Sequence, residues 1–223
     1  MPSEETITKL IPKFIKNNTP QSLELEQRFS QIKENTWNPN TVLHEIGVQL
    51  GQLMSILGAS EASQEHGRKF TDISDELCDI ALQLIYLTSE LNLNLAEISA
   101  NKEYVEFNST NLFDLYPLYG QITETFLEEE RNRFAKPREG FETRLDFIKD
   151  RIIKMYIIIF NYAEEKNIDM NRRYQKMCTE AKEFVAKKTK SKRAEVIKRI
   201  LLPAKRKPKK NLPVLSGGHY GNA

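Results

Sequence analysis

The chain has 223 residues, of which 39% are hydrophobic and 29% are charged, and its formal net charge is +2. This length allows one large domain or two small ones with a buried core, and no apolar run reaches the roughly 18 residues that a membrane span needs. We therefore exclude a membrane-spanning protein and, because the N-terminus resembles neither a signal peptide nor a transit peptide, expect an intracellular protein of the cytoplasm or nucleus.

The small net charge hides a strong asymmetry along the chain. Residues 182–210 hold thirteen Lys or Arg and two acids, a net charge of +11, whereas the rest holds 20 basic and 29 acidic residues, a net charge of −9. An acidic body joined to a basic C-terminal segment predicts two separate roles.

Nearly every segment with a readable pattern has helical periodicity, and no alternating run is long enough to build a sheet. We therefore predict an all-α fold. After an N-terminal segment (1–20), the first half is expected to form a helix over about 21–35, a turn at "NTWNPN", a helix over 41–57 that ends at Gly58, and a helix over about 72–91 capped by Thr71 or Asp72.

The second half of the chain repeats this pattern weakly. "LTSELNLNLAEI" (87–98) and "NYAEEKNIDMNRRY" (161–174) both place an Asn-containing turn after a long apolar helix, and "VQLGQLMSIL" (48–57) is similar to "GQITETFLEE" (120–129). Gln121 and Glu124 then correspond to Gln49 and Gln52. We predict two tandem helical halves, residues 21–107 and 108–187, that pack as an intrachain pseudo-dimer, followed by a basic flexible tail over 188–223.

Two helices of the first half carry polar pairs at the spacing of one helical turn. Glu76 and Asp79 lie three residues apart, as do Gln49 and Gln52, so each pair shares a helix face. Two facing acidic pairs would give magnesium the oxygen ligands it prefers and would leave room for phosphate oxygens and an attacking water. The alternative for Glu76 and Asp79 is a solvated first turn, where the helix dipole favours acids.

These stretches resemble a known family. Trp37, "PNTVLHEIGVQLGQLMSIL" (39–57) and "DELCDIALQLIYLTSELNLNLAEI" (75–98) are similar to the MazG-like all-α NTP pyrophosphatase superfamily, most closely to its dCTP pyrophosphatase branch. The resemblance covers about the first half of the chain. It implies helical bundles that assemble as homo-oligomers and hydrolyse nucleoside triphosphates to the monophosphate and pyrophosphate with Mg²⁺.

The resemblance also implies roles for individual residues. Glu76 and Asp79 would be metal ligands and catalytic residues, Trp37 would lie near the nucleobase, and Lys102 would contact phosphate. Trp37 fits equally well as a hydrophobic staple for the following helix. The Asn and Arg that usually follow the family's phosphate-binding lysine are missing after Lys102.

The first acidic pair departs from the family pattern, because Gln49 and Gln52 occupy its positions and Val48 lies beside them. A glutamine carbonyl can coordinate Mg²⁺, but it brings no charge and cannot act as a general base. Glu45, one turn before Gln49, could restore a carboxylate ligand. Glu124 or Glu128 could do so from the second half.

The basic segment "KKTKSKRAEVIKRILLPAKRKPKK" (187–210) begins with a helical pattern and continues into a Pro-rich sequence. Its composition fits a nuclear import signal, a contact with nucleic acid or an acidic partner through residues 182–210, or a solvated tail.

Two functions are therefore open. The first is a MazG-like, Mg²⁺-dependent nucleoside triphosphate pyrophosphohydrolase, with a metal bound by Glu76 and Asp79 and by Gln49, Gln52 and Glu45. The second is a catalytically inactive protein of the same fold that acts as a nucleotide-sensing, scaffold or nucleic-acid-associated subunit of a larger assembly.

Overall fold

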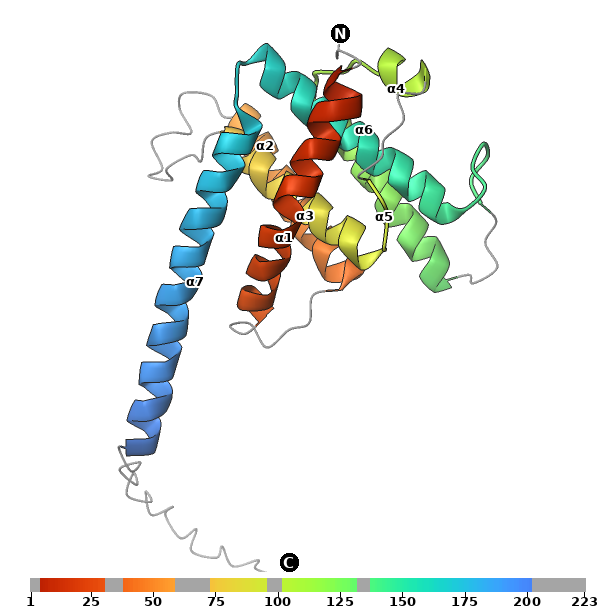
Figure 1. The fold of residues 1–223 in the computed structure, drawn as a ribbon. Helices are drawn as coiled ribbons and strands as arrows, with labels where there is room; N and C mark the ends of the chain where they lie inside the picture. Colours follow the sequence, from red (N-terminus) through yellow and green to blue (C-terminus); the bar gives the residue numbers. More distant parts are fainter. Residues whose placement is uncertain (1–4, 31–37, 59–72, 96–101, 132–136, 202–223) are drawn as a thin grey trace, which may run out of the picture.

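The computed structural model describes residues 5–30, 38–58, 73–95, 102–131 and 137–201 (Figure 1), with side-chain surroundings described for all of these except residues 7, 102, 129–131 and 191–201. The described residues form helices and no strand, which confirms the predicted all-α class. In chain order the elements are η1 (Thr6–Leu10), α1 (Ile11–Ser30), α2 (Pro39–Leu57), α3 (Ile73–Glu90), α4 (Lys102–Glu106), η3 (Leu112–Asp114), α5 (Leu115–Arg131), α6 (Arg144–Glu165) and α7 (Met170–Leu201).

The predicted start of the first helix, at about residue 21, is wrong, because α1 already begins at Ile11. Its early turns bury Ile11, Phe14 and Ile15 in the core. The sequence is misleading here because Pro20, which usually interrupts a helix, lies inside α1, and the packing of the apolar face outweighs the missing hydrogen bond. The predicted boundary between the N-terminal segment and the first half, at residue 20, therefore falls within a helix.

The predicted bounds of the next two helices agree with the structure to within two residues. The Asn38 side chain accepts a hydrogen bond of 2.9 Å from the backbone N–H of Thr41, and Pro39 occupies the first helical position, so both residues favour the start of α2. α2 ends before Gly58 as predicted. α3 runs over Ile73–Glu90, and the predicted caps Thr71 and Asp72 lie outside the described residues.

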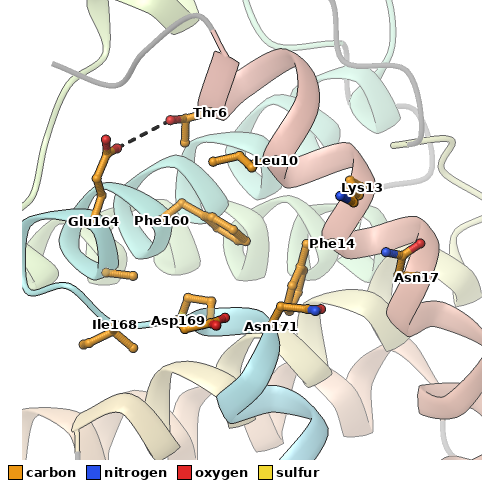
Figure 2. A pocket seen from close by; sticks show the side chains of 12 residues that line it. Thr6, Leu10, Lys13, Phe14, Asn17, Phe160, Glu164, Ile168, Asp169 and Asn171 are labelled. Carbon is orange, nitrogen blue, oxygen red and sulfur yellow. Dashed lines mark hydrogen bonds between the residues drawn. The ribbon is translucent and has the colours of Figure 1, made fainter.

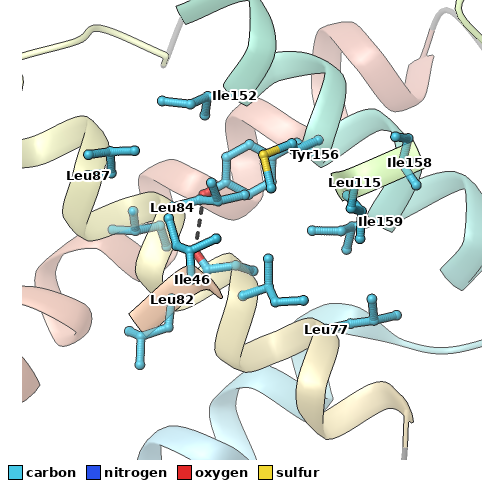
Figure 3. Close-up of a cluster of buried hydrophobic side chains, with 14 of the residues drawn as sticks. Ile46, Leu77, Leu82, Leu84, Leu87, Leu115, Ile152, Tyr156, Ile158 and Ile159 are labelled. Carbon is cyan, nitrogen blue, oxygen red and sulfur yellow. Dashed lines mark hydrogen bonds between the residues drawn. The ribbon is translucent and has the colours of Figure 1, made fainter. Parts of the chain in front are cut away.

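The centre of the molecule is formed by α3 and α6, which are buried on most of their faces (Figure 1, Figure 3). Apolar side chains such as Leu84, Ile152 and Ile159 meet there, and the Tyr156 hydroxyl donates a hydrogen bond of 3.2 Å to the backbone carbonyl of Ala81. Such helices carry apolar residues all round, because neighbours cover every side. α2 packs on α3, α5 packs on α6, and α1 and α7 also contact α3.

The two Asn-containing turns predicted from the repeat have the same backbone conformation. Asn92 and Asn167 are left-handed, with φ of 53° and 55°. In each turn the next N–H reaches back over the helix end, from Leu93 to the Thr88 carbonyl at 2.8 Å and from Ile168 to the Ala163 carbonyl at 2.7 Å. This is the arrangement of a Schellman motif. The helices α3 and α6 therefore end in the same local motif.

The last helix, α7, is 32 residues long and only its first part packs on the bundle (Figure 1). Tyr174, Cys178 and Val185 are buried, whereas Lys187, Lys188 and Lys190 are exposed. The basic segment thus begins as helix through Leu201, and residues 202–223 lie outside the described residues. Within the described ranges, no helix combines the length and the apolar character that crossing a membrane requires.

Candidate functional site

A cavity of about 430 Å³ opens between the end of α1 and the helices α2, α3 and α7. Residues at helical spacing on α2, α3 and α7 line it, together with one residue of α1. The lining residues are Phe29 of α1, Glu45 and Gln49 of α2, Asp79, Leu82, Gln83 and Tyr86 of α3, and Met177, Glu180, Ala181 and Phe184 of α7.

Three of the predicted metal ligands line this cavity together. Glu45 and Gln49 are one turn apart on α2, and Asp79 lies opposite them on α3, which packs along α2. The side chain of Gln52 is exposed and does not line the cavity. Glu76 is only 2% exposed and also does not line it. The structure thus brings together two positions of the predicted quartet and Glu45.

Asp79 is in an electrostatically unfavourable position. Burial, followed by the neighbouring carboxylates of Glu76 and Asp75, raises the pKa of its carboxyl group to about 7. Asp79 forms no hydrogen bond or ion pair with the described part of the chain. A bound cation would favour the ionised form and would lower this pKa.

Two amide side chains of the cavity have buried oxygens that lack a hydrogen-bond partner among the described residues. These atoms are Oε1 of Gln49 and Oε1 of Gln83, and Gln83 as a residue is only 6% exposed. A buried acceptor without a partner costs about 1–3 kcal/mol, so such atoms in native proteins usually face a ligand or water. Both residues line the cavity, but these two oxygens have almost no accessible surface, so they do not face its open space.

The α7 wall of the cavity was missed by sequence reasoning. Met177, Glu180 and Phe184 follow each other at intervals of three and four residues, which predicts a shared helix face. The spacing contains no information about which helix that face meets, so the contribution of α7 depends on the tertiary fold.

The corresponding positions of the second half form an ion-pair network instead of a cavity. Arg151 and Lys154, which the predicted repeat aligns with Glu76 and Asp79, both pair with Asp150, Lys154 at 3.2 Å, and Lys154 also contacts Glu103. Asp150 is 4% exposed and Lys154 is 8% exposed. These charges are already satisfied within the protein.

The proposed substitutes from the second half do not line the cavity. Glu124 and Glu128 both pair with Arg138, at 2.9 Å and 3.0 Å. Of the carboxylates that could replace the missing acidic pair, only Glu45 lies on the described cavity wall.

The two predicted substrate-binding residues are not placed by the structure. Trp37 lies outside the described residues, and Lys102 begins α4 with a side chain that is likewise outside them. The described aromatic residues on the cavity wall are Phe29, Tyr86 and Phe184.

A second cavity, of about 360 Å³, lies where α1, the end of α6 and the start of α7 meet (Figure 2). Phe14 and Phe160 form much of its apolar wall, and the Thr6 hydroxyl donates a hydrogen bond of 3.5 Å to Glu164 beside it. Its lining mixes Lys13 with the carboxylates Glu164 and Asp169, so it lacks the one-sided charge of the first cavity.

The described part of the chain contains no group of three or more His, Cys, Asp or Glu side chains arranged to hold a metal ion. Comparisons of the chain with models of protein families, with curated proteins and with solved structures yield no match.

Proposed function

We propose that the protein is a nucleoside triphosphate pyrophosphohydrolase that releases the monophosphate and pyrophosphate, with its substrate bound in the cavity between α2, α3 and α7. The observation that carries the proposal is that Glu45, Gln49 and Asp79 line the same cavity from two adjacent helices. Carboxylate and amide oxygens are the ligands that Mg²⁺ prefers, and these three residues carry them. These residues therefore fit a magnesium ion.

The residues divide the cavity into two regions. Bound Mg²⁺ would neutralise charge on the triphosphate and polarise its anhydride bond. Glu45 and Asp79 would position the metal, and the bound cation would keep the Asp79 carboxyl group ionised by lowering its pKa from about 7. The aromatic side chains of Phe29 and Phe184 offer a surface on which a nucleobase can stack.

The test is pyrophosphate release from each common ribo- and deoxyribonucleoside triphosphate in the presence of Mg²⁺. We expect release by the wild type, loss by at least about tenfold in Asp79→Asn, and a gain in Gln49→Glu, which restores a charged ligand. Glu142→Gln, which changes an exposed carboxylate away from the cavity wall, is the matched control.

A second candidate function is a non-catalytic nucleotide sensor or scaffold of the same fold. The amide at Gln49 and the exposed position of Gln52 outside the cavity favour it, because both remove negative charge from the metal site. In that case the wild type binds Mg²⁺ and nucleotide without releasing pyrophosphate.

We also propose that the two halves form an intrachain pseudo-dimer. In a two-fold arrangement, residues near the axis contact their own equivalents. Gly47 packs against Tyr119, and these residues are separated by the same 72 positions that separate Gln49 from Gln121. Tyr156 binds the carbonyl of Ala81 across the 75 positions that separate Glu76 from Arg151. Sedimentation analysis of the purified protein would show whether chains assemble further into a homo-oligomer or a larger complex.

For the basic end of α7 we propose contact with the phosphate backbone of nucleic acid. Lys187, Lys188 and Lys190 are exposed on a helix that extends past the bundle (Figure 1). Removal of residues 191–223 combined with replacement of Lys187, Lys188 and Lys190 by Ala should weaken salt-dependent binding to DNA or RNA strongly and leave the cavity residues in place. Unchanged binding after these changes would assign the contact elsewhere, and absence of nucleic-acid binding in the full chain would favour an acidic protein partner.

A further inference from the structure

The cavity where α1, the end of α6 and the start of α7 meet shares no lining residue with the proposed nucleotide site (Figure 2). Its volume is about 360 Å³, and apolar atoms form most of its wall. Phe14 of α1 and Phe160 of α6 contribute aromatic rings whose centroids lie 5.2 Å apart. Pockets of about 300–1,000 Å³ with apolar walls and a few polar groups are the usual binding sites of small molecules. The cavity therefore has the size and the wall of a ligand site.

One helix face provides this cavity with both apolar contacts and a positive charge. Leu10, at the end of η1, is followed at helical spacing by Lys13, Phe14 and Asn17 of α1, and all four line the cavity. Phe14 is buried, whereas Leu10 is 46% exposed. A ligand with an apolar body would therefore remove apolar surface of Leu10 from water.

The charges on the cavity wall differ in whether they already have partners. The Asp169 carboxylate accepts a hydrogen bond of 3.0 Å from the backbone N–H of Arg172, and the Glu164 carboxylate accepts one of 3.5 Å from the Thr6 hydroxyl. Lys13 is the sole basic residue among the described residues that line the cavity, and its ammonium group has no partner in the described part of the chain. Figure 2 shows Lys13 and Glu164 on opposite sides of the cavity. An anionic group beside Lys13 would thus meet a cation and lie away from Glu164.

We propose that this cavity binds a carboxylic acid with an apolar body, such as a medium-chain fatty acid. The carboxylate binds at Lys13, where the amide N–H groups of Asn17 offer further donors. The alkyl chain lies along the apolar side chains of Phe14, Phe160 and Ile168. Most of the affinity comes from this chain, because Lys13 is exposed and water screens its attraction for the carboxylate. This binding goes beyond nucleotide hydrolysis, since it uses another cavity and requires neither metal nor nucleotide.

The experiment is calorimetric titration of the full chain with octanoate at low salt, without metal and nucleotide. Hexanoate tests the contribution of the alkyl chain, and octylamine, which carries the opposite charge on a chain of the same length, tests the contribution of the carboxylate. We expect octanoate to bind and hexanoate to bind about tenfold more weakly, because it lacks two methylene groups. Octylamine should bind at least about threefold more weakly than octanoate.

Two pairs of variants locate the site. Lys13→Met should weaken octanoate binding about threefold and abolish the preference over octylamine. Its control, Lys16→Met, changes an exposed lysine of α1 that does not line the cavity, so it should leave binding unchanged. Leu10→Asn should weaken octanoate binding by about threefold to tenfold. Its control, Leu145→Asn, changes a leucine that is 45% exposed and lies outside the cavity wall.

Circular dichroism confirms that each variant is folded before titration. Absence of octanoate binding to the wild type overturns the proposal, as does equal binding of octylamine, or equal binding by the wild type and either cavity variant. If the control variants weaken binding as much as the cavity variants, octanoate binds the surface in general, and the cavity assignment is wrong. Because neither metal nor nucleotide is present, the result is independent of whether the protein releases pyrophosphate.

Discussion

The helix pair α2 and α3 differs from the pair α5 and α6 in whether its buried charged side chains form ion pairs. In the second pair, Arg151 and Lys154 are paired with Asp150. In the first pair, Asp79 is partly buried beside Glu76, and no described residue offers it a counter-charge. Charges that stabilise a fold are paired within it, whereas charges that await a ligand carry a cost until the ligand binds. The comparison therefore indicates stabilising ion pairs in the second half and supports the proposal that the first half contains the binding site.

The largest expected effect is in the second half. Asp150→Asn removes the carboxylate that holds both Arg151 and Lys154, and it leaves a nearly buried lysine with only the exposed Glu103 as partner. We expect the free energy of unfolding to fall by about 3 kcal/mol, measured by urea denaturation. The exposed Glu139→Gln serves as control. A loss of only about 0.5 kcal/mol or less would show that the network does not stabilise the fold.

In the first half, neutralising the partly buried Asp79 should instead raise the free energy of unfolding. The pKa of Asp79 is about 7 when folded and 3.8 in the reference state, so the folded protein binds a proton more readily between these values. The contribution of Asp79 to stability is therefore highest below pH 3.8 and falls as the pH rises through 7. Asp79→Asn removes this loss.

We expect Asp79→Asn to have a higher free energy of unfolding than the wild type. This difference should be about 2 kcal/mol larger at high pH than at low pH, as measured by urea denaturation on either side of pH 7. A variant that is equally or less stabilised at the higher pH would mean that Asp79 is not destabilised in its ionised form.

The contact between the halves can be tested at Gly47. A methyl group there would lie 2.6 Å from the Tyr119 hydroxyl, which donates a hydrogen bond of 3.0 Å to the Leu43 carbonyl. Gly47→Ala should therefore cost about 1–2 kcal/mol, and less in a Tyr119→Phe background. A double-mutant cycle in thermal denaturation measures the coupling. Additive effects would remove this contact as support for the pseudo-dimer.

The smallest expected effect comes from substitutions in the two similar turns after α3 and α6. Asn92→Ala and Asn167→Ala each place a less suitable residue in a left-handed position, so each should cost about 0.5–1 kcal/mol. The two losses, measured by chemical denaturation, should agree within about 0.5 kcal/mol. A large difference would show that the turns are alike in backbone conformation but not in energetic role.

Much of the fold can be predicted from local patterns. The bounds of α2 follow from Asn38, Pro39 and Gly58, which act on their own neighbours. The start of α1 was missed because Pro20 is locally unfavourable, and its cost is offset by apolar contacts far away in the sequence.

The candidate site was less predictable. Residue spacing and the packing of adjacent helices predicted one site for Glu45, Gln49, Gln52, Glu76 and Asp79. Glu45, Gln49 and Asp79 line the same cavity, whereas Gln52 and Glu76 do not. Gln83, Glu180 and Phe184 were missed, since their role depends on which face of α3 meets α7. That choice is made by packing across about a hundred residues of intervening chain.

The most direct test of the account is a calorimetric titration of Mg²⁺ into the protein together with a non-hydrolysable nucleoside triphosphate, with the wild type, Asp79→Asn and Gln49→Glu compared. We predict binding by the wild type, tighter binding by Gln49→Glu and loss of binding by Asp79→Asn. Equal binding by all three proteins, or no binding by any of them, would contradict the assignment of the α2–α3 cavity as the metal and nucleotide site.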